Sequence, residues 1–321
     1  VLGCAVRADM TVTFVGLKSG LFLGDAPNFC GDIRFAGLDI PDQCRDGIAP
    51  AYQRIDEALL AEALGPRSRG AHKGDFGHVL VVGGGEGMPG AARLAAEAAL
   101  RTGAGRVSIA THPSHAAMLV ATRPELMSHA IADNAALGPL LEKADVVVFG
   151  PGLGQSEWAG GLYKLVAEAE QPAVWDADAL NLLAIDRCSS ENRVITPHPG
   201  EAATLLGCSA ADIQADRPAA LASLVEQYGG TAVLKGAGSL ISNGSVPFVC
   251  ASGNPGMASP GMGDVLTGII AALIAQGLDP GQAAAVGVEV HARAGDRAAT
   301  GGERGMMASD LMAELRAVLN P

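Results

Sequence analysis

The sequence is poor in aromatic residues and has no long apolar run. Phe, Trp and Tyr make up 4% of its 321 residues, and the apolar content comes mostly from Ala, Val and Leu. This composition favours a parallel sheet covered by helices over an aromatic-rich β-barrel. The longest apolar stretch, Val265 to Ile274, is far shorter than the roughly 20 residues that a membrane-spanning helix needs. It therefore predicts a buried core helix.

Basic clusters and closely spaced cysteines are also missing. The formal net charge is −12 and no run of Lys and Arg stands out, so we expect neither nucleic acid nor a membrane as partner. No CxxC spacing occurs, which disfavours metal and disulfide frameworks and predicts reduced thiols in the cytoplasm. The six cysteines are Cys4, Cys30, Cys44, Cys188, Cys208 and Cys250. Anionic ligands must then be bound by local features.

The N-terminal part of the sequence does not form a core by itself. It begins without Met and without the pattern of a signal peptide, so we expect that further sequence precedes residue 1. A short strand is predicted over Thr11 to Val15, and a second extended piece over Asp32 to Ile40. An amphipathic helix is predicted from Tyr52 to Leu64.

From His78 onwards, predicted strands and helices alternate. The strands are predicted at His78–Val82, Arg106–Ala110, Val146–Phe149, Ala173–Asp176, Val194–Thr196, Ala232–Lys235 and Ser239–Ser242. The helices between them are predicted at Ala91–Thr102, Gly161–Glu170, Gly200–Leu206 and Pro218–Tyr228. This order indicates βαβ units on a mostly parallel sheet, whose ligands bind at the carboxyl ends of the strands.

A glycine-rich loop leads into the apolar helix and carries one carboxylate at the junction. From Gly253 to Gly268 the sequence is GNPGMASPGMGDVLTG. Glycines let backbone N–H groups approach an anion, and a helix N-terminus adds unpaired donors and the positive end of its dipole. No Gly-Lys-Ser/Thr follows, which excludes a Walker A loop. Asp264, in the first helical turn, is then either a partner of the helix dipole or a base in phosphoryl transfer.

A second glycine-rich loop, GEGMPG from Gly85 to Gly90, follows a strand and opens a helix. It matches the pattern of dinucleotide-binding folds, but the acidic residue expected about 20 positions later is absent, since the second strand ends in Ala110-Thr111-His112. A tight strand-to-helix turn is the plainer interpretation. Gly90 and Ala91 would still leave room for a bulky ring at the helix N-terminus.

Four further loops follow predicted strands. GPGLG from Gly150 suggests backbone held against a ligand. In DADALN from Asp176, the first Asp is a candidate to orient a metal-bound water, and Asp178 or Asn181 to cap the next helix. TPHPGE from Thr196 holds His198 between prolines and puts Glu201 in a first helical turn. Lys235 begins a Lys-Gly connection between extended segments that could meet nucleotide phosphates or ribose.

Taken in order, these motifs resemble a known family. The Gly-x-Gly-Asp loop is similar to that of the ribokinase-like superfamily, in which it supplies an anion hole and an aspartate base for a substrate hydroxyl. The motifs HKGDFGHVLVVGG from His72, GPGLG, DADALN, TPHPGE, LKG from Leu234 and GNPGMASPGMGDVLTG together resemble the ADP- or ATP-dependent NAD(P)H-hydrate dehydratases. The resemblance extends from about Tyr52 to Leu319, and implies a three-layer α/β/α fold with a mostly parallel central sheet.

The resemblance also implies two domains. Residues 1–45 look like the end of the NAD(P)H-hydrate epimerase domain that precedes the dehydratase in bifunctional repair enzymes, and residues 46–321 look like the dehydratase. The catalytic and potassium-binding motifs of the epimerase would lie before residue 1, so we do not assign that activity to this chain.

In that family, the substrate is the S form of hydrated NADH or NADPH (NADHX or NADPHX), which carries a hydroxyl on the reduced pyridine ring. The resemblance implies that Asp264 activates this hydroxyl for attack on the terminal phosphoryl group of ADP or ATP, while amides near Gly261 and Gly263 stabilise the transferred charge. Elimination of phosphate then restores the dihydronicotinamide. Mg²⁺ is expected as cofactor, held largely through water and without a dedicated set of protein ligands.

The implied contacts fall on named positions of this sequence. Ala91, Gly152, His198 and Asp264 would contact the hydrate. The protein as a whole is expected to be a cytoplasmic homo-oligomer. The residues that would contact the adenine nucleotide are Lys235, Gly236, Ala237, Gly238, Ser239 and Gly263.

Two other functions stay open. A small-molecule kinase of the same fold, acting on a hydroxymethylpyrimidine, a thiazole alcohol or pyridoxal, would stop at the phosphorylated product. A nucleotide-sensing module would keep the pocket without catalysis, although it would have no need of Asp264 beside the anion hole. The sequence does not decide between ADP and ATP, or between NADHX and NADPHX.

Overall fold

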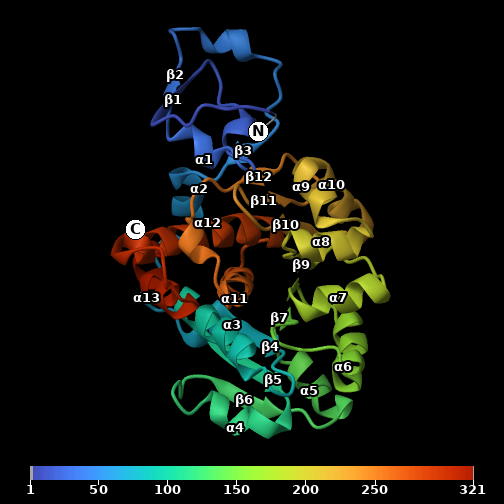
Figure 1. Ribbon diagram of the computed structural model, residues 1–321. Helices are drawn as coiled ribbons and strands as arrows, with labels where there is room; N and C mark the ends of the chain where they lie inside the picture. Colours follow the sequence, from blue (N-terminus) through green and yellow to red (C-terminus); the bar gives the residue numbers. More distant parts are fainter. Residues whose placement is uncertain (1–2, 321) are drawn as a thin grey trace.

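A computed structural model describes residues 3–320 and shows a layered α/β body with a small N-terminal lobe (Figure 1). The strands are β1 (Met10–Phe14), β2 (Asp32–Ala36), β3 (Gln53–Arg54), β4 (His78–Val82), β5 (Arg106–Thr111), β6 (Met127–Ala130), β7 (Val146–Phe149), β8 (Ala173–Trp175), β9 (Arg193–Ile195), β10 (Thr231–Leu234), β11 (Leu240–Ser242) and β12 (Phe248–Val249). The α-helices are α1 (Pro27–Cys30), α2 (Glu57–Ala63), α3 (Pro89–Thr102), α4 (Ala116–Leu119), α5 (Gly138–Leu141), α6 (Glu157–Ala167), α7 (Asp178–Ile185), α8 (Pro199–Leu206), α9 (Ala210–Ala215), α10 (Arg217–Tyr228), α11 (Met262–Ala275), α12 (Pro280–Ala298) and α13 (Ala308–Val318).

The central sheet has ten strands in the order β3-β12-β11-β10-β9-β8-β7-β4-β5-β6. The strands from β10 to β6 in this order are parallel, whereas β11 is antiparallel to both of its neighbours. Since β4 to β10 are parallel, their carboxyl ends meet at one edge of the sheet. The predicted mostly parallel sheet is therefore confirmed.

Alternate residues of the central strands belong to two different cores. In β4, Val79 and Val81 pack in a core with α3, α11, α12 and α13, while Leu80 and Val82 pack on the opposite face with α6, α7, α8 and α10. Successive side chains of a strand point to opposite faces of a sheet, so an unbroken apolar run is expected of a strand covered on both faces. The result is three layers, with the sheet between two layers of helices.

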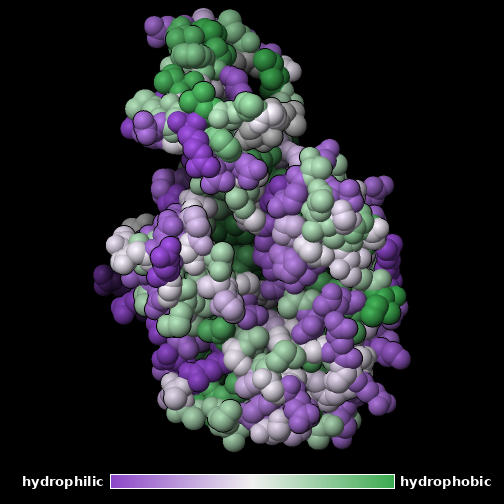
Figure 2. Space-filling model, in the orientation of Figure 1, coloured by the Kyte–Doolittle hydropathy of each residue, from purple (hydrophilic) through white to green (hydrophobic). Residues whose placement is uncertain are grey.

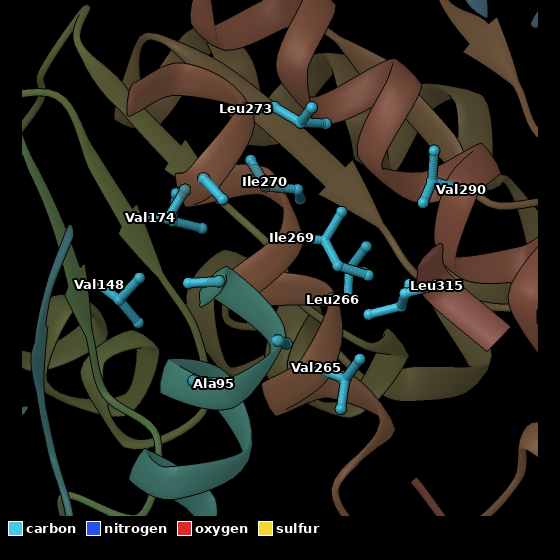
Figure 3. Packing of buried hydrophobic residues seen from close by; sticks show 14 of the residues in the cluster. Ala95, Val148, Val174, Val265, Leu266, Ile269, Ile270, Leu273, Val290 and Leu315 are labelled. Atoms are coloured by element: carbon cyan, nitrogen blue, oxygen red, sulfur yellow. The ribbon is translucent and has the colours of Figure 1, made fainter. Parts of the chain in front are cut away.

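The first of these cores is built around α11, the helix predicted from the apolar run. Ile269 and Ile270 of α11 are fully buried and belong to the same core as Val148 and Val174 of the sheet and Ala95 of α3 (Figure 3). A Cβ added at Gly268 would lie 2.0 Å from the Ala95 carbonyl oxygen, so α3 and α11 can approach this closely only because residue 268 is glycine. This packing fixes the N-terminus of α11, which carries Asp264.

The N-terminal lobe projects from one end of the body (Figure 1). Its parallel pair β1 and β2 forms a sheet of two strands, and the side chains of Met10, Val12 and Phe14 in β1 are exposed. Phe22, in contrast, is 9% exposed and belongs to the core on the α8 and α10 face of the central sheet. The lobe is thus anchored to the body through the region around Phe22.

The structure corrects one predicted helix and adds two strands that were not predicted. The helix predicted from Tyr52 begins only at Glu57, because Gln53 and Arg54 pair with β12 as an edge strand and Asp56 caps the helix. Strand β6 was not predicted, since its sequence Met-Ser-His-Ala has no β-branched residue. Strand β12 was also not predicted, and at two residues it is too short to show a pattern.

Candidate functional site

The predicted site residues follow neighbouring strands at one edge of the sheet. Asp176 comes directly after β8, Glu201 lies in the first turn of the helix after β9, and Lys235 comes directly after β10. Asp264 lies in the first turn of α11 and faces the same place. In the space-filling view, the surface is hollowed between α8 and the segment that leads into α11 (Figure 2).

Lys235 is the centre of this cluster. Its Nζ lies 2.7 Å from Asp176 Oδ1 and 3.6 Å from Glu201 Oε2, and its side chain is 19% exposed. Burial alone would lower the pKa of Lys235, but Asp176 and Glu201 outweigh burial and hold this pKa above its ordinary value. The ammonium group therefore stays charged and holds the loops after β8 and β10 together.

The Asp176 carboxylate is fixed by two side chains, those of Lys235 and Thr267. Besides the ion pair, its Oδ2 accepts a hydrogen bond of 3.1 Å from the Thr267 hydroxyl of α11. Burial would raise the pKa of Asp176, and Lys235 reverses that effect, so the pKa lies below its ordinary value. The next residue, Ala177, has φ +52°, which is unusual for a side chain with a Cβ and marks local backbone strain at the site.

Asp264 differs from Asp176 both in the direction of its pKa shift and in its hydrogen bonds. Burial raises its pKa to about 7, with Asp176 adding to the rise and Lys235 opposing it. The N-cap of α11 is Gly261 and has no side-chain cap, and no donor among the described residues hydrogen-bonds to the Asp264 carboxylate. The structure therefore gives Asp264 no capping role and leaves both of its oxygens free for a ligand.

The backbone beside Asp264 is shaped by two glycines. Gly261 has φ +89°, and a Cβ there would lie 2.6 Å from Leu94 of α3. A Cβ at Gly263 would lie 3.1 Å from Asp176 Oδ2 and 3.2 Å from Lys235 Nζ, so even an alanine would press on the ion pair. The free N–H groups of this turn and the helix dipole make it suited to bind an anion.

The other glycine-rich loops pack against each other. The Gly84 N–H donates to the Pro151 carbonyl at 2.9 Å and the Gly85 N–H to the Gly152 carbonyl at 2.6 Å. A Cβ at Gly152 would lie 3.0 Å from the Ala91 Cβ, so the two predicted hydrate-binding positions are neighbours. The Asp178 carboxylate accepts a hydrogen bond of 2.8 Å from the Gly154 N–H rather than capping its own helix, which answers one of the open alternatives.

His198 has a structural role as well as an exposed edge. Its Nδ1 accepts hydrogen bonds of 3.0 and 3.2 Å from the Gly200 and Glu201 N–H groups, and thereby caps α8. The His198 N–H in turn donates to the Glu201 carboxylate at 2.7 Å, which completes a capping box. The side chain of His198 is 56% exposed, and its Nε2 lies 3.5 Å from Glu201, so one ring edge remains available to a ligand.

The predicted nucleotide loop, Lys235 to Ser239, is supported from two sides. The Arg217 guanidinium donates to the Leu234 carbonyl at 3.0 Å and to the Gly238 carbonyl at 3.3 Å. Burial lowers the pKa of Arg217. A Cβ at Gly238 would lie 2.0 Å from the Phe22 carbonyl oxygen, so the N-terminal lobe rests directly on this loop.

Some features of the site were not predicted. The sequence motifs include Asp176 and Glu201, but the pattern gave no sign that both converge on Lys235, from which they are 59 and 34 positions away (235 − 176 and 235 − 201). The roles of Thr267 and Arg217 were not predicted either, because nothing in the sequence shows that their side chains reach Asp176 and the loop after β10. Charge complementarity between loops after nearby parallel strands was the signal that could have paired Lys235 with Asp176, which follow β10 and β8 on either side of β9.

Comparisons with known proteins agree with this geometry. A family model described as NAD(P)H-hydrate dehydratase matches residues 79–317. The bifunctional NAD(P)H-hydrate repair enzyme of Coxiella burnetii is 48% identical over 100% of this chain, and that of Escherichia coli is 47% identical over 99%. The chain spans 66% and 62% of the length of these two relatives, respectively.

Solved structures give the same result for the fold. A ribokinase-like superfamily protein of Enterococcus faecalis has a TM-score of 0.79 at 28% identity, covering 84% of this chain and 96% of that one. The ADP/ATP-dependent NAD(P)H-hydrate dehydratase of Bacillus subtilis, co-crystallised with ATP and Mg²⁺, has a TM-score of 0.75 at 26% identity, covering 84% of this chain and 98% of that one. The predicted ribokinase-like fold is confirmed, and the chain belongs to the NAD(P)H-hydrate dehydratase family.

Proposed function

We propose that this chain uses ADP or ATP to dehydrate the S form of hydrated NADH or NADPH, and thereby repairs a damaged cofactor. The observation that carries the proposal is Asp264. A half-buried carboxylate with a pKa of about 7, to which no donor among the described residues hydrogen-bonds, stands beside a glycine turn at a helix N-terminus. A group that titrates near neutral pH can take a proton from a hydroxyl, which a carboxylate of ordinary pKa does less readily.

The chemistry follows from this placement. Asp264 takes the proton of the ring hydroxyl as its oxygen attacks the terminal phosphoryl group of the nucleotide, and the bond to the nucleotide's bridging oxygen breaks. The N–H groups of the turn at Gly261 and Gly263 stabilise the transferred charge. The ring nitrogen then donates its lone pair, the C–O bond breaks, and inorganic phosphate leaves with the electrons of that bond. Loss of a ring proton completes the dehydration without redox change.

Binding is assigned to two sides of the hollow. The hydrate lies against Ala91, Gly152 and His198, which the glycine-loop contacts and the capping box hold in place. The adenine nucleotide lies along the loop of Lys235, Gly236, Ala237, Gly238 and Ser239, with its phosphates directed towards Gly263. The Gly236 N–H donates to the Ser239 hydroxyl at 3.2 Å, so the loop is closed on itself before any ligand binds.

Mg²⁺ belongs to the proposal as well. In residues 3–320, no group of three His, Cys, Asp or Glu side chains is arranged to hold a metal ion, so the protein does not form a complete site by itself. Carboxylates are nevertheless the ligands that Mg²⁺ accepts, and Asp176 and Glu201 would hold it together with phosphate oxygens and water. When bound, the ion would neutralise phosphate charge.

The wider organisation is also proposed. Residues 1–45 are assigned to the end of an epimerase domain and residues 46–321 to the dehydratase, which is supported by the small two-stranded sheet of the lobe and by the length of the bifunctional relatives. We place the protein in the cytoplasm as a homo-oligomer; its six cysteines are all free. No helix among the described residues has the length and apolarity to cross a membrane.

One assay tests the function. Purified protein with Mg²⁺ is given hydrated NADH with ADP or ATP in parallel, and the near-ultraviolet absorbance of the dihydronicotinamide and the released phosphate are followed together. The proposal requires one NADH and one phosphate per turnover, with ADP as the better donor. A stable phosphorylated product without NADH would identify a small-molecule kinase instead.

A further inference from the structure

A cavity of about 510 Å³ lies between α3 and α13, outside the cluster around Lys235. Its volume falls within the range of small-molecule sites. One wall is a stripe of α3 with helical spacing: Gly90, Arg93, Leu94, Glu97 and Arg101. The remaining lining residues are Arg123, Ser309, Met312 and Ala313.

The cavity is cationic, in contrast to the protein as a whole. Three arginines line it and one carboxylate, Glu97, opposes them. Glu97 is buried and already accepts hydrogen bonds from Arg123 at 2.5 Å and from Arg101 at 3.2 Å. No ion pair is found for Arg93 within the described residues, and Arg123 Nε is buried without a hydrogen-bond partner. The lining residues therefore carry an excess of two positive charges, although the chain as a whole has a net charge of −12.

Two of the lining residues of the cavity border the proposed substrate site. Gly90 precedes Ala91, the residue assigned to the hydrate, and Leu94 is the side chain that a Cβ at Gly261 would meet. From Gly90 to Arg101, α3 extends about 16 Å away from that point. The substrate is a dinucleotide that needs to be held far beyond its reacting ring.

We propose that this cavity binds the phosphate groups of the hydrated dinucleotide, with Arg93, Arg101 and Arg123 as their partners. Arginine suits phosphate because its planar guanidinium donates two parallel hydrogen bonds. The inference rests on the proposed function and adds a subsite that the catalytic cluster does not contain. The cavity would favour NADPHX, whose additional phosphate offers more charge to the same arginines.

The test compares Arg93→Gln with Arg316→Gln. Arg93 has no ion pair to lose, so its replacement should leave the fold intact, and Arg316 is an exposed arginine of α13 that does not line the cavity. We expect Arg93→Gln to raise KM for hydrated NADPH about tenfold or more and KM for hydrated NADH less, with kcat and KM for ADP within twofold of the parent. Arg316→Gln should match the parent.

Two outcomes would overturn the subsite. One is that the parent turns over and that Arg93→Gln and Arg316→Gln have equal KM values for hydrated NADPH. The other comes from calorimetry, which needs no turnover: with ADP saturating, NADPH should bind Arg93→Gln more weakly than Arg316→Gln, and equal affinities refute the proposal. If the parent itself produces no NADH, the proposed function fails, and the calorimetric comparison still decides the subsite.

Discussion

Replacement of Asp264 by Asn should stabilise the protein at alkaline pH and leave it unchanged at acid pH. The folded state holds the pKa of Asp264 at about 7, whereas the ordinary value is 3.8. A carboxyl group whose pKa is higher in the folded state stabilises that state when the pH is below its pKa in the unfolded chain. This contribution is lost as the pH rises through its pKa in the folded protein. Between pH 4 and pH 8, the charged carboxylate therefore comes to oppose folding.

The magnitude follows from the shift of about three pKa units. At 1.36 kcal/mol per unit, the cost of ionising Asp264 in the folded protein is about 4 kcal/mol above pH 7. Asparagine has the same shape without the charge, and no helix cap is lost, because Asp264 does not cap α11. The thermal midpoint of Asp264→Asn should exceed that of the parent by roughly 5–10 °C at pH 8 and by nearly nothing at pH 4.

Thermal unfolding of both proteins between pH 4 and pH 9 measures this difference. Asp25→Asn, which changes an exposed carboxylate, serves as control and should show no such trend. A variant that is less stable than the parent at pH 8, or a difference that does not vary with pH, would refute the assignment of a raised pKa to Asp264.

Three further predictions concern the same cluster. The kcat/KM of the dehydratase should rise with pH and reach half its maximum near pH 7, because the base must be ionised; a profile that is flat from pH 5 to pH 8 would contradict this. Lys235→Met should cost about 3–5 kcal/mol in unfolding free energy, since it leaves Asp176 buried without its ion pair. It should also shift the midpoint of the pH profile to higher pH, because the ammonium lowers the pKa of Asp264. Ala177→Gly should raise stability by about 1 kcal/mol in denaturant unfolding, since glycine relieves the strain at φ +52°, and a loss of stability would show that the strain is not real.

Much of the layered fold could be predicted from the sequence, because its signals are local. The Val-rich runs of β4 and β7 were predicted with their observed bounds, since strands buried on both faces have unbroken apolar sequences. The N-terminus of α11 was also predicted, from glycines before an apolar run. Two-residue strands such as β3 and β12 were not, because pairing with a neighbour rather than local composition makes them strands.

The sequence pointed to several residues that the structure brings together, but not to their electrostatics. Asp264 was recognised from the loop around it, yet its raised pKa depends on burial and on carboxylates from other loops, which only the fold brings together. Lys235 was predicted to meet the nucleotide; its ion pair with Asp176 could not be inferred from residues so far apart in the chain. The nucleotide contacts of Lys235 to Ser239 stay a prediction.

The most direct test of the account is the turnover of Asp264→Asn. Hydrated NADH, ADP and Mg²⁺ are supplied to parent and variant prepared alike, and the affinity for ADP is measured on the same samples. The account predicts a loss of about 10²–10⁴ in turnover with ADP affinity nearly unchanged, because the variant keeps the shape of the site and loses only its base. Turnover within a few-fold of the parent would contradict the role of Asp264 as the base that activates the substrate hydroxyl.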